Sequence, residues 1–349
     1  MATRSELRSA VHFLDVGQAH ATVAVDADSA VVVDCPQRGV RPASELLAEV
    51  DPVRLDVVVT HRDLDHCGGV HELLRRFGNS ATKLYMNAAM SVSPHSTSQP
   101  RVKAVVRSIL AAVDEVGARE KPALRGEVGH AGTISWVALA PTHRQVLDAA
   151  VGGSVNRSSV VLRLELAGYR FLIPGDIDDE AVKELLRSGM EVSAYVFLLP
   201  HHGAKLQRFS KLLAAVDPRY VVVSAGRRPS HPALETLRAA AAYDCRIMCT
   251  EVATHCHRGA IDPQHCAGSI EFKMRALPRS GSYRSRAHGQ DSSLGHPCLS
   301  RIELCRQAAG ASETLTPATD PTLGPERREI MLNVSGLLYG TANRGSTRS

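Results

Sequence analysis

The sequence predicts a layered α/β protein in which helices cover the faces of β-sheets. Between residues 10 and 275, short runs rich in Val, Ile and Leu alternate with segments of helical periodicity, a pattern typical of this class. Hydrophobic residues make up 44% and charged residues 22% of the 349 positions, as is ordinary for globular domains. Neither a G-x-G-x-x-G sequence nor a P-loop is present, so folds that bind nucleotide cofactors lose their main support.

In the first half, β-branched residues and short spacing predict a meander followed by alternating strands and helices. The predicted strands cover 11–16, 21–26, 30–35, 55–60 and 82–87. The predicted helices cover 43–50, 70–78 and 101–117. The run LDVVVT at 55–60 is apolar almost throughout, which is typical of a strand buried on both faces.

The second half repeats this alternation. The predicted strands cover 134–141, 158–168, 169–174, 196–200, 220–225, 246–251 and 269–275. The predicted helices cover 178–189, 209–216 and 232–243. We therefore assign residues 10–275 to one α/β domain.

The segment 276–349 differs in composition, because it is rich in Ser, Thr, Gly, Pro and Arg. Its apolar density is too low to offset the entropy of ordering, so we expect a largely disordered tail. Within it, residues 331–340 (MLNVSGLLYG) are either a short docking segment or a fortuitous apolar patch.

The stretch THRDLDHCGG at 60–69 concentrates four candidate metal ligands: His61, Asp63, Asp65 and His66. In an extended segment alternate side chains share one face, so the first three are expected to point together. The two glycines that follow permit a bend that brings His66 to the same place. Imidazole and carboxylate together form a ligand set for Zn, Mn or Fe rather than Ca.

Other polar residues follow apolar strands elsewhere in the chain. Asp34 follows the strand at 30–35, Asp176 follows YRFLIPG, and His201 and His202 follow VFLLP. Strand ends converge at one edge of a sheet, where α/β proteins usually build their sites. The sequence thus predicts a metal site assembled from distant parts of the chain.

The order H-x-D-x-D-H-x-G-G, G-D and H-H-G resembles the metallo-β-lactamase fold superfamily. The further stretches HFLDVGQ, PGD, LLPHHGA and SAGRRPSHP resemble the soluble hydrolase domain of ComEC/Rec2-type competence proteins over residues 10–275. This resemblance implies a four-layer αββα sandwich with two divalent metal ions, Zn or Mn, at one edge. It also implies hydrolysis of phosphodiesters, in DNA or RNA, by a metal-activated hydroxide that two ions about 3.5 to 4 Å apart can share.

The resemblance also implies how the ligands divide between two metal positions. Asp63 stands where the superfamily more often has His, and Asn156 stands near the place of a missing third-motif His. Site one then contains His61, Asp63, Asn156 and a bridging Asp176. Site two contains Asp65, His66, Asp176 and either His201 or His202, with His201 favoured because it follows the strand directly.

Several residues are expected to support catalysis around these ligands. Asp65 is counted with them, His231 is a candidate general acid or phosphate contact, and Lys205 a candidate phosphate contact. Asp34 is expected to orient ligands by hydrogen bonds, with an ordinary turn-capping role as the alternative. Asp15 is also expected to support the ligands, although DVGQAH carries His20 where the family has an acid.

A separate Cys/His group near the end of the domain is a possible structural zinc site. It contains Cys249, Cys256, His265 and Cys266. Its spacings match no ordinary zinc finger, so thiols scattered in a loop are the alternative.

Three functions stay open on this evidence. The first is a metal-dependent phosphodiesterase or nuclease with a nucleic-acid or other phosphodiester substrate. The second is an acyl hydrolase of the lactonase, β-lactamase or thioesterase type, and the third is a catalytically weak regulatory module with a protein partner. No secretory signal and no apolar run of roughly 18 residues is evident, so we expect a cytoplasmic location without membrane contact.

Overall fold

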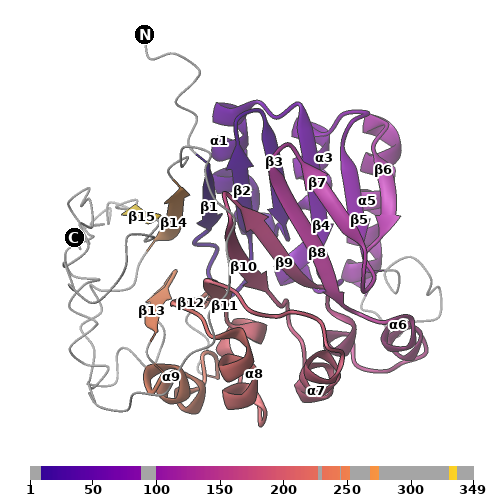
Figure 1. The fold of residues 1–349 in the computed structure, drawn as a ribbon. Helices are drawn as coiled ribbons and strands as arrows, with labels where there is room; N and C mark the ends of the chain where they lie inside the picture. The colour runs from indigo at the N-terminus through magenta and orange to yellow at the C-terminus, as the bar shows by residue number, and fades with distance from the viewer. Residues whose placement is uncertain are drawn as a thin grey trace, which may run out of the picture.

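The computed structural model describes residues 9–87, 100–226, 230–243, 245–251, 268–274 and 330–335. Two mixed β-sheets pack face to face, and helices cover their outer faces (Figure 1). The first sheet has the order β15 (Ile330–Ser335), β14 (Ser269–Met274), β1 (Ala10–Phe13), β2 (Thr22–Asp26), β3 (Ser29–Val33), β4 (Arg54–Val59), β5 (Lys83–Met86), β6 (Arg119–Pro122). The second has the order β13 (Arg246–Cys249), β12 (Tyr220–Val223), β11 (Val196–Leu198), β10 (Tyr169–Ile173), β9 (Val161–Leu166), β8 (Ile134–Ala140), β7 (Val128–Ala131).

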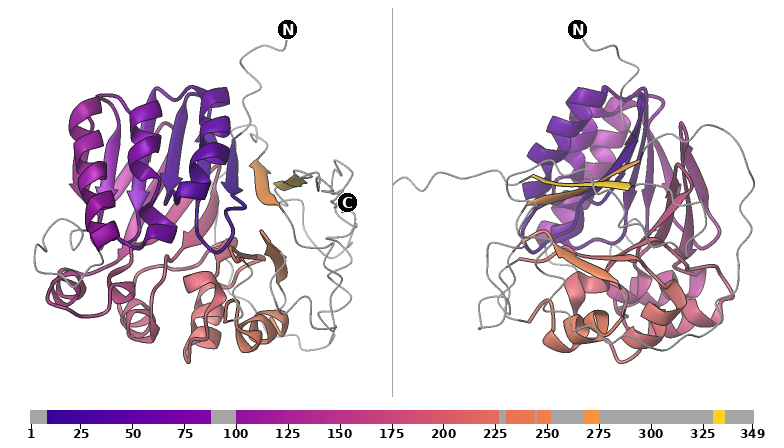
Figure 2. Two further views of the ribbon diagram at one scale, coloured as in Figure 1. Left: turned by 180° about the vertical axis from the view of Figure 1, so that it is seen from behind. Right: turned by 60° about the vertical axis from the view of Figure 1, so that its left-hand side comes forward.

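The helices form the two outer layers, which Figure 2 shows from two further sides. Those on the first sheet are α1 (Val40–Val50), α3 (Val70–Phe77) and α5 (Pro100–Val116). Those on the second sheet include α7 (Asp179–Arg187), α8 (Phe209–Val216) and α9 (Leu234–Ala241). The short helix α6 (His143–Ala150) begins with a capping box between Thr142 and Gln145. The predicted αββα sandwich is therefore confirmed.

Strand β4 shows why an uninterrupted apolar run belongs at the centre of such a fold. Val57 and Val59 pack into the layer under the helices of the first sheet. Val58 points the other way and packs between the two sheets. Alternate side chains of a strand face opposite sides, so both sets must be apolar when both faces are covered.

The sequence pattern does not predict strands β6 and β7 or helix α6. All four residues of β6 are exposed, and their sequence REKP has no apolar face. The strand forms because it pairs in parallel with β5 at the edge of the sheet. Charged residues and proline are common on such edges, where they hinder pairing with another chain.

Strand β15 pairs antiparallel with β14 and lies inside the segment predicted as a disordered tail. The other residues of 276–349 lie outside the described residues, so both the disordered tail and the domain boundary at 275 stay predictions. Within the part of the chain that the structure describes, no helix combines the length and apolarity required to cross a bilayer.

The parallel strands bring their carboxyl ends to one edge of the sandwich. In the first sheet β3 runs parallel to β4, and in the second β10 runs parallel to β11. The two sheets meet there because the amide of Val160 donates to the carbonyl of Thr60 at 2.9 Å. The chain segments that follow these strands therefore face one another.

Phe272 on β14 fastens the two sheets together. It is fully buried and makes edge contacts with Phe13 at 5.9 Å, Phe171 at 6.0 Å and Tyr220 at 5.3 Å between ring centroids. We expect Phe272→Ala to lower the free energy of unfolding by about 3–5 kcal/mol, because it leaves a cavity between the sheets. Urea denaturation measures this change. The exposed Val53→Ala should alter stability by less than about 0.5 kcal/mol, and equal effects of both variants would contradict this packing.

Candidate metal centre

The segment after β4 supplies four potential ligands through a change of backbone conformation. Asp63 is extended and precedes the short helix α2 (Leu64–Cys67). Asp65 and His66 are consequently placed by a helical turn, and not by the alternation of an extended strand that the sequence suggested. A Cβ at Gly69 would lie 2.3 Å from Val40 and 2.7 Å from the carbonyl of Pro36. The glycine therefore permits close packing of α2 against the neighbouring loop.

Asp176 is the centre to which the other groups point. Its side chain is almost fully buried at the end of β10, and its amide donates to the hydroxyl of Ser159 at 3.3 Å. Gly175 before it has φ +57°, and a Cβ there would lie 3.0 Å from Thr60 Cβ. Only a residue without a side chain lets the end of β10 approach the end of β4 this closely.

Three imidazoles surround the carboxylate of Asp176. The separations are 3.2 Å from Oδ1 to His66 Nε2, 3.8 Å from Oδ2 to His61 Nε2, and 3.9 Å from Oδ2 to His202 Nε2. Two overlapping groups, His61/His66/Asp176 and Asp65/His66/His202, each have their ligand atoms within 4.8 Å of one another. Both groups fit a divalent cation by their donor types.

The other ring nitrogen of each imidazole is already engaged. His66 Nδ1 lies 2.7 Å from Asp34 Oδ2, His202 Nδ1 lies 2.8 Å from the carbonyl of Ser224, and His61 Nδ1 lies 3.1 Å from Thr60 Oγ1. All three Nε2 atoms are buried, and none forms a hydrogen bond, although each lies near the carboxylate of Asp176. Buried polar atoms seldom lack a partner, and histidines that bind metals characteristically donate their other N–H in this way. The residues present therefore fit a metal site.

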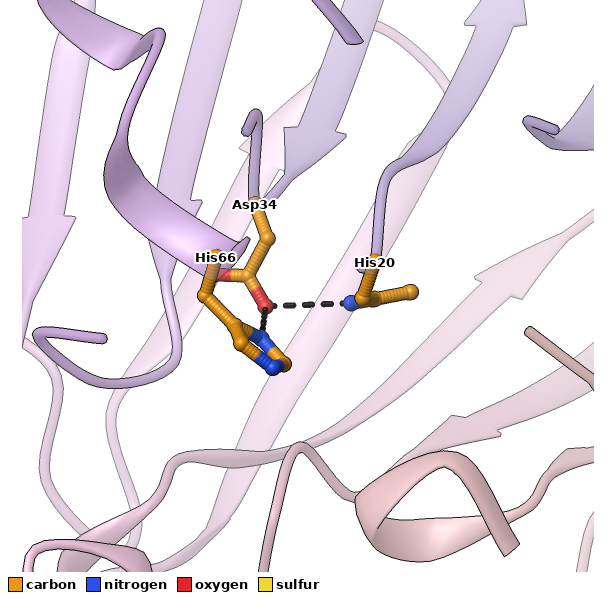
Figure 3. Close-up of side chains that lie close together, drawn as sticks. All are labelled: His20, Asp34 and His66. Atoms are coloured by element: carbon orange, nitrogen blue, oxygen red, sulfur yellow. Dashed lines mark hydrogen bonds and ion pairs between the residues drawn. The ribbon is translucent and has the colours of Figure 1, made fainter. Parts of the chain in front are cut away.

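The carboxylate of Asp34 contacts the imidazoles of both His66 and His20 (Figure 3). Its Oδ2 accepts from His66 Nδ1 at 2.7 Å, His20 Nδ1 at 3.0 Å and the Thr60 hydroxyl at 2.7 Å. Its Oδ1 accepts from the Thr60 amide at 2.7 Å. A carboxylate with four donors orients its neighbours, so the geometry favours the orienting role of Asp34 over the turn-capping alternative.

Charge balance inside the cluster perturbs several groups. Burial alone would raise the pKa of Asp176, but His66, His61 and His202 hold it well below its ordinary value. Burial alone would lower the pKa of His66, but Asp176 and Asp34 hold it well above its ordinary value. Burial lowers the pKa of His202 to about 4. Attraction between the buried carboxylates of Asp34 and Asp176 and the imidazole of His66 thus offsets part of the cost of burying these groups.

The turn after β11 places His202, and not the favoured His201, next to Asp65 and His66. The 3-10 segment η4 (Pro200–Gly203) contains two left-handed residues, His201 with φ 50° and His202 with φ 54°. Because of this turn His202 is buried and its Nε2 lies 3.8 Å from Asp65 Oδ2. His201 keeps 31% of its side chain exposed and lies 3.7 Å from Asp176 Oδ2. The compact group with Asp65 and His66 therefore contains His202.

The remaining predicted catalytic and metal residues occupy different positions. His231 packs its ring against His201 at 5.0 Å between centroids. Lys205 is exposed and pairs with Glu235 at 3.1 Å. Asn156 lies in η3 (Asn156–Ser158), where its carbonyl accepts from the amide of Ser159 at 3.0 Å; no described contact of its side chain reaches the cluster. Asp63 Oδ2 lies 3.7 Å from His61 Nε2.

Asp15 lies apart from this network. It is exposed, and its carboxylate accepts from the amide of Gly17 at 3.4 Å. Asp34 instead contacts His20, whose Nδ1 lies 3.0 Å from Asp34 Oδ2 and whose Nε2 lies 2.8 Å from Thr22 Oγ1. The departure DVGQAH is the signal for His20 in the sequence, but no sequence pattern indicates that this imidazole lies next to a carboxylate 14 residues later.

The possible structural zinc group is only partly described. Cys249 is buried on β13. Cys256, His265 and Cys266 lie outside the described residues, so that site stays a prediction.

Comparison with known proteins places this geometry among related folds. Residues 14–227 match a family profile described as "Metallo-beta-lactamase superfamily". The chain is 25% identical over 197 residues to ComE operon protein 3 of Bacillus subtilis (strain 168). The aligned region covers 56% of this chain and 23% of that protein. The chain thus spans less than a quarter of the length of this curated relative.

The chain is also similar to solved structures, of which we report two. Igni18, described as a novel metallo hydrolase from Ignicoccus hospitalis KIN4/I, is 16% identical with a TM-score of 0.46, covering 76% of this chain and all of the other. The metallo-beta-lactamase fold protein YhfI from Bacillus subtilis is 9% identical with a TM-score of 0.43, covering 69% of this chain and 96% of the other.

The hydrogen bonds of Asp34 generate a prediction about metal affinity. We expect Asp34→Asn to weaken binding of Zn or Mn by about 10- to 100-fold, because His66 loses the acceptor that aims its Nε2. Isothermal titration calorimetry with the metal-free protein measures the change. Asp56→Asn is the matched control, since Asp56 is also a buried carboxylate but accepts from Trp136 at 3.2 Å, on another part of β4. Equal weakening in both variants would contradict the orienting role.

Proposed function

Because the chain belongs to the metallo-β-lactamase superfamily of metal-dependent hydrolases, we propose that it hydrolyses phosphodiester bonds in DNA or RNA with the help of two divalent cations, Zn or Mn. The observation that carries this proposal is the set of three buried Nε2 atoms, from His61, His66 and His202, that surround Asp176. When bound there, divalent cations supply Lewis acidity toward a phosphoryl oxygen and acidify water.

The protein's own residues supply the positioning. Asp34, Ser224 and Thr60 contact the Nδ1 atoms of the three imidazoles, so each ring points its Nε2 toward Asp176. Asp176 and Asp65 contribute negative charge that balances the cations. A site whose groups are already oriented needs little reorganisation during reaction.

The substrate approaches from the side where His201 and His231 lie. Both are only partly buried, whereas His61, His66 and His202 are buried. Among the predicted catalytic residues, we propose His231 as the one that contacts a bound phosphodiester, and its ring contact with His201 at 5.0 Å supports this role. Lys205 is a weaker candidate, because it already pairs with Glu235.

The choice of phosphodiesters over acyl substrates rests on the competence-type motifs and on the 25% identity to ComE operon protein 3. Both support the same branch of the superfamily, which itself hosts several reactions. A nucleic-acid substrate and a cytoplasmic location are parts of this proposal.

Incubation with Mn or Zn and a panel of substrates tests the proposal. The panel contains single- and double-stranded DNA, RNA, bis-p-nitrophenyl phosphate, nitrocefin and a thioester. We expect metal-dependent cleavage of the phosphodiesters. The cleavage rate should fall by more than about 100-fold in Asp176→Asn and Asp65→Ala, because removing a metal ligand costs more activity than removing a hydrogen bond that supports a ligand. Glu45→Gln, an exposed carboxylate on α1, should retain the wild-type rate.

Other outcomes would replace the proposed reaction. Turnover of nitrocefin or the thioester alone would identify an acyl hydrolase. Absence of all turnover in protein that demonstrably binds metal would favour the regulatory module.

A further inference from the structure

We propose that the consecutive residues His201 and His202 bind different metal ions, and that His201 replaces the ligand that site one lacks. The inference rests on the proposed binding of two divalent cations. It concerns how this chain completes a site for which its sequence offers only His61, Asp63 and the shared Asp176 as strong ligands.

Two series of ligand atoms extend from Asp176. On one side, the separations are 3.7 Å from Asp63 Oδ2 to His61 Nε2, 3.8 Å from His61 Nε2 to Asp176 Oδ2, and 3.7 Å from Asp176 Oδ2 to His201 Nε2. Two ligand atoms that share one tetrahedral ion at ordinary bond lengths lie roughly 3.4 Å apart. These separations are therefore close to those of ligands that share an ion.

For the other position, His202 Nε2 lies 3.8 Å from Asp65 Oδ2 and 3.9 Å from Asp176 Oδ2, while His66 Nε2 lies 3.2 Å from Asp176 Oδ1. His66 also forms a compact group with His61 and Asp176, so the two positions are adjacent. Asp65, His66 and His202 already belong to a compact group. That position has its full complement of strong ligands without His201, which leaves His201 for the other position.

The backbone explains how neighbouring residues reach two sites. His201 and His202 both adopt the left-handed conformation, which is uncommon for residues other than glycine and persists only where the surrounding structure fixes it. The amide of His201 donates to the carbonyl of Gly175 at 3.0 Å, so His201 is tied beside Asp176. In a regular strand, consecutive side chains would point to opposite faces, and one imidazole would be lost to the cluster.

The two sites should differ in affinity. His61, Asp63, Asp176 and His201 do not form one of the groups whose ligand atoms all lie within 4.8 Å of one another. His201 is also 31% exposed, whereas the side chain of His202 is 3% exposed. Ion binding must therefore draw the ligands of site one together, and site one should be the weaker of the two.

Counting bound ions tests the assignment. Metal-free protein is dialysed against Co²⁺ at increasing concentration, and the bound metal is measured by mass spectrometry and by the Co²⁺ ligand-field absorption. We expect two ions per wild-type chain, with the second bound more weakly. His201→Asn should weaken only the second ion, by more than about 100-fold, since a direct ligand matters more than its supporting hydrogen bonds. His202→Asn should weaken only the first.

The variants are chosen to separate ligand loss from misfolding. Asparagine tolerates the left-handed conformation, and His201→Gly repeats the test with a residue that adopts it freely. Thermal unfolding of each metal-free variant checks the fold. His231→Asn, next to His201, and Asn156→Ala, the ligand expected from the sequence, are the controls and should keep both ions.

Three outcomes would overturn the assignment: two ions of unchanged affinity in His201→Asn and His201→Gly, one ion in the wild type, or loss of an ion in Asn156→Ala. Each is read without substrate. The ligand assignment can thus fail while phosphodiester hydrolysis stands, and two correctly assigned ions in a protein without turnover would reject only the reaction.

Discussion

The buried carboxylate of Asp34 is the constraint on which the metal centre depends. It gathers donors from His20, Thr60 and His66, and so ties the ends of β3 and β4 to α2. A buried charge of this kind is tolerated only when its oxygens are fully hydrogen-bonded. The same bonds fix which nitrogen of His66 points toward Asp176. Stability of the sheet edge and orientation of the ligands therefore arise from one group.

Asp176 poses the complementary electrostatic problem. Its carboxylate is buried among His61, His66 and His202, whose Nε2 atoms form no hydrogen bond. Attraction between buried groups of opposite charge offsets part of the desolvation cost, and a divalent cation would offset more. The second sheet presents Asp176 and the paired histidines, while the first presents the ligands of the 60–66 segment. Face-to-face packing of the sheets, fastened by Phe272, is what brings the halves together.

Much of the fold could be predicted because its strands are buried on both faces. The run 55–60 is apolar on consecutive positions, and β4 indeed faces two cores through Val57 and Val58. Strand β6 could not be predicted, because its residues are all exposed and only its pairing with β5 makes it a strand. The hydrogen bonds that stabilise β6 come from β5, more than 30 residues earlier in the chain, so the periodicity of the four residues of β6 does not predict them.

The sequence by itself determined which kinds of side chain follow the strands, and therefore that imidazoles and carboxylates would meet at one edge. Strand ends converge for topological reasons, so this conclusion needed no atomic detail. Only the tertiary structure decided which nitrogen each histidine presents, that His20 rather than Asp15 supports Asp34, and that His202 rather than His201 joins Asp65 and His66. These choices depend on backbone dihedral angles and on partners far along the chain. The left-handed conformation of His201 and His202 redirects both side chains. The identities of the neighbouring residues do not predict this conformation.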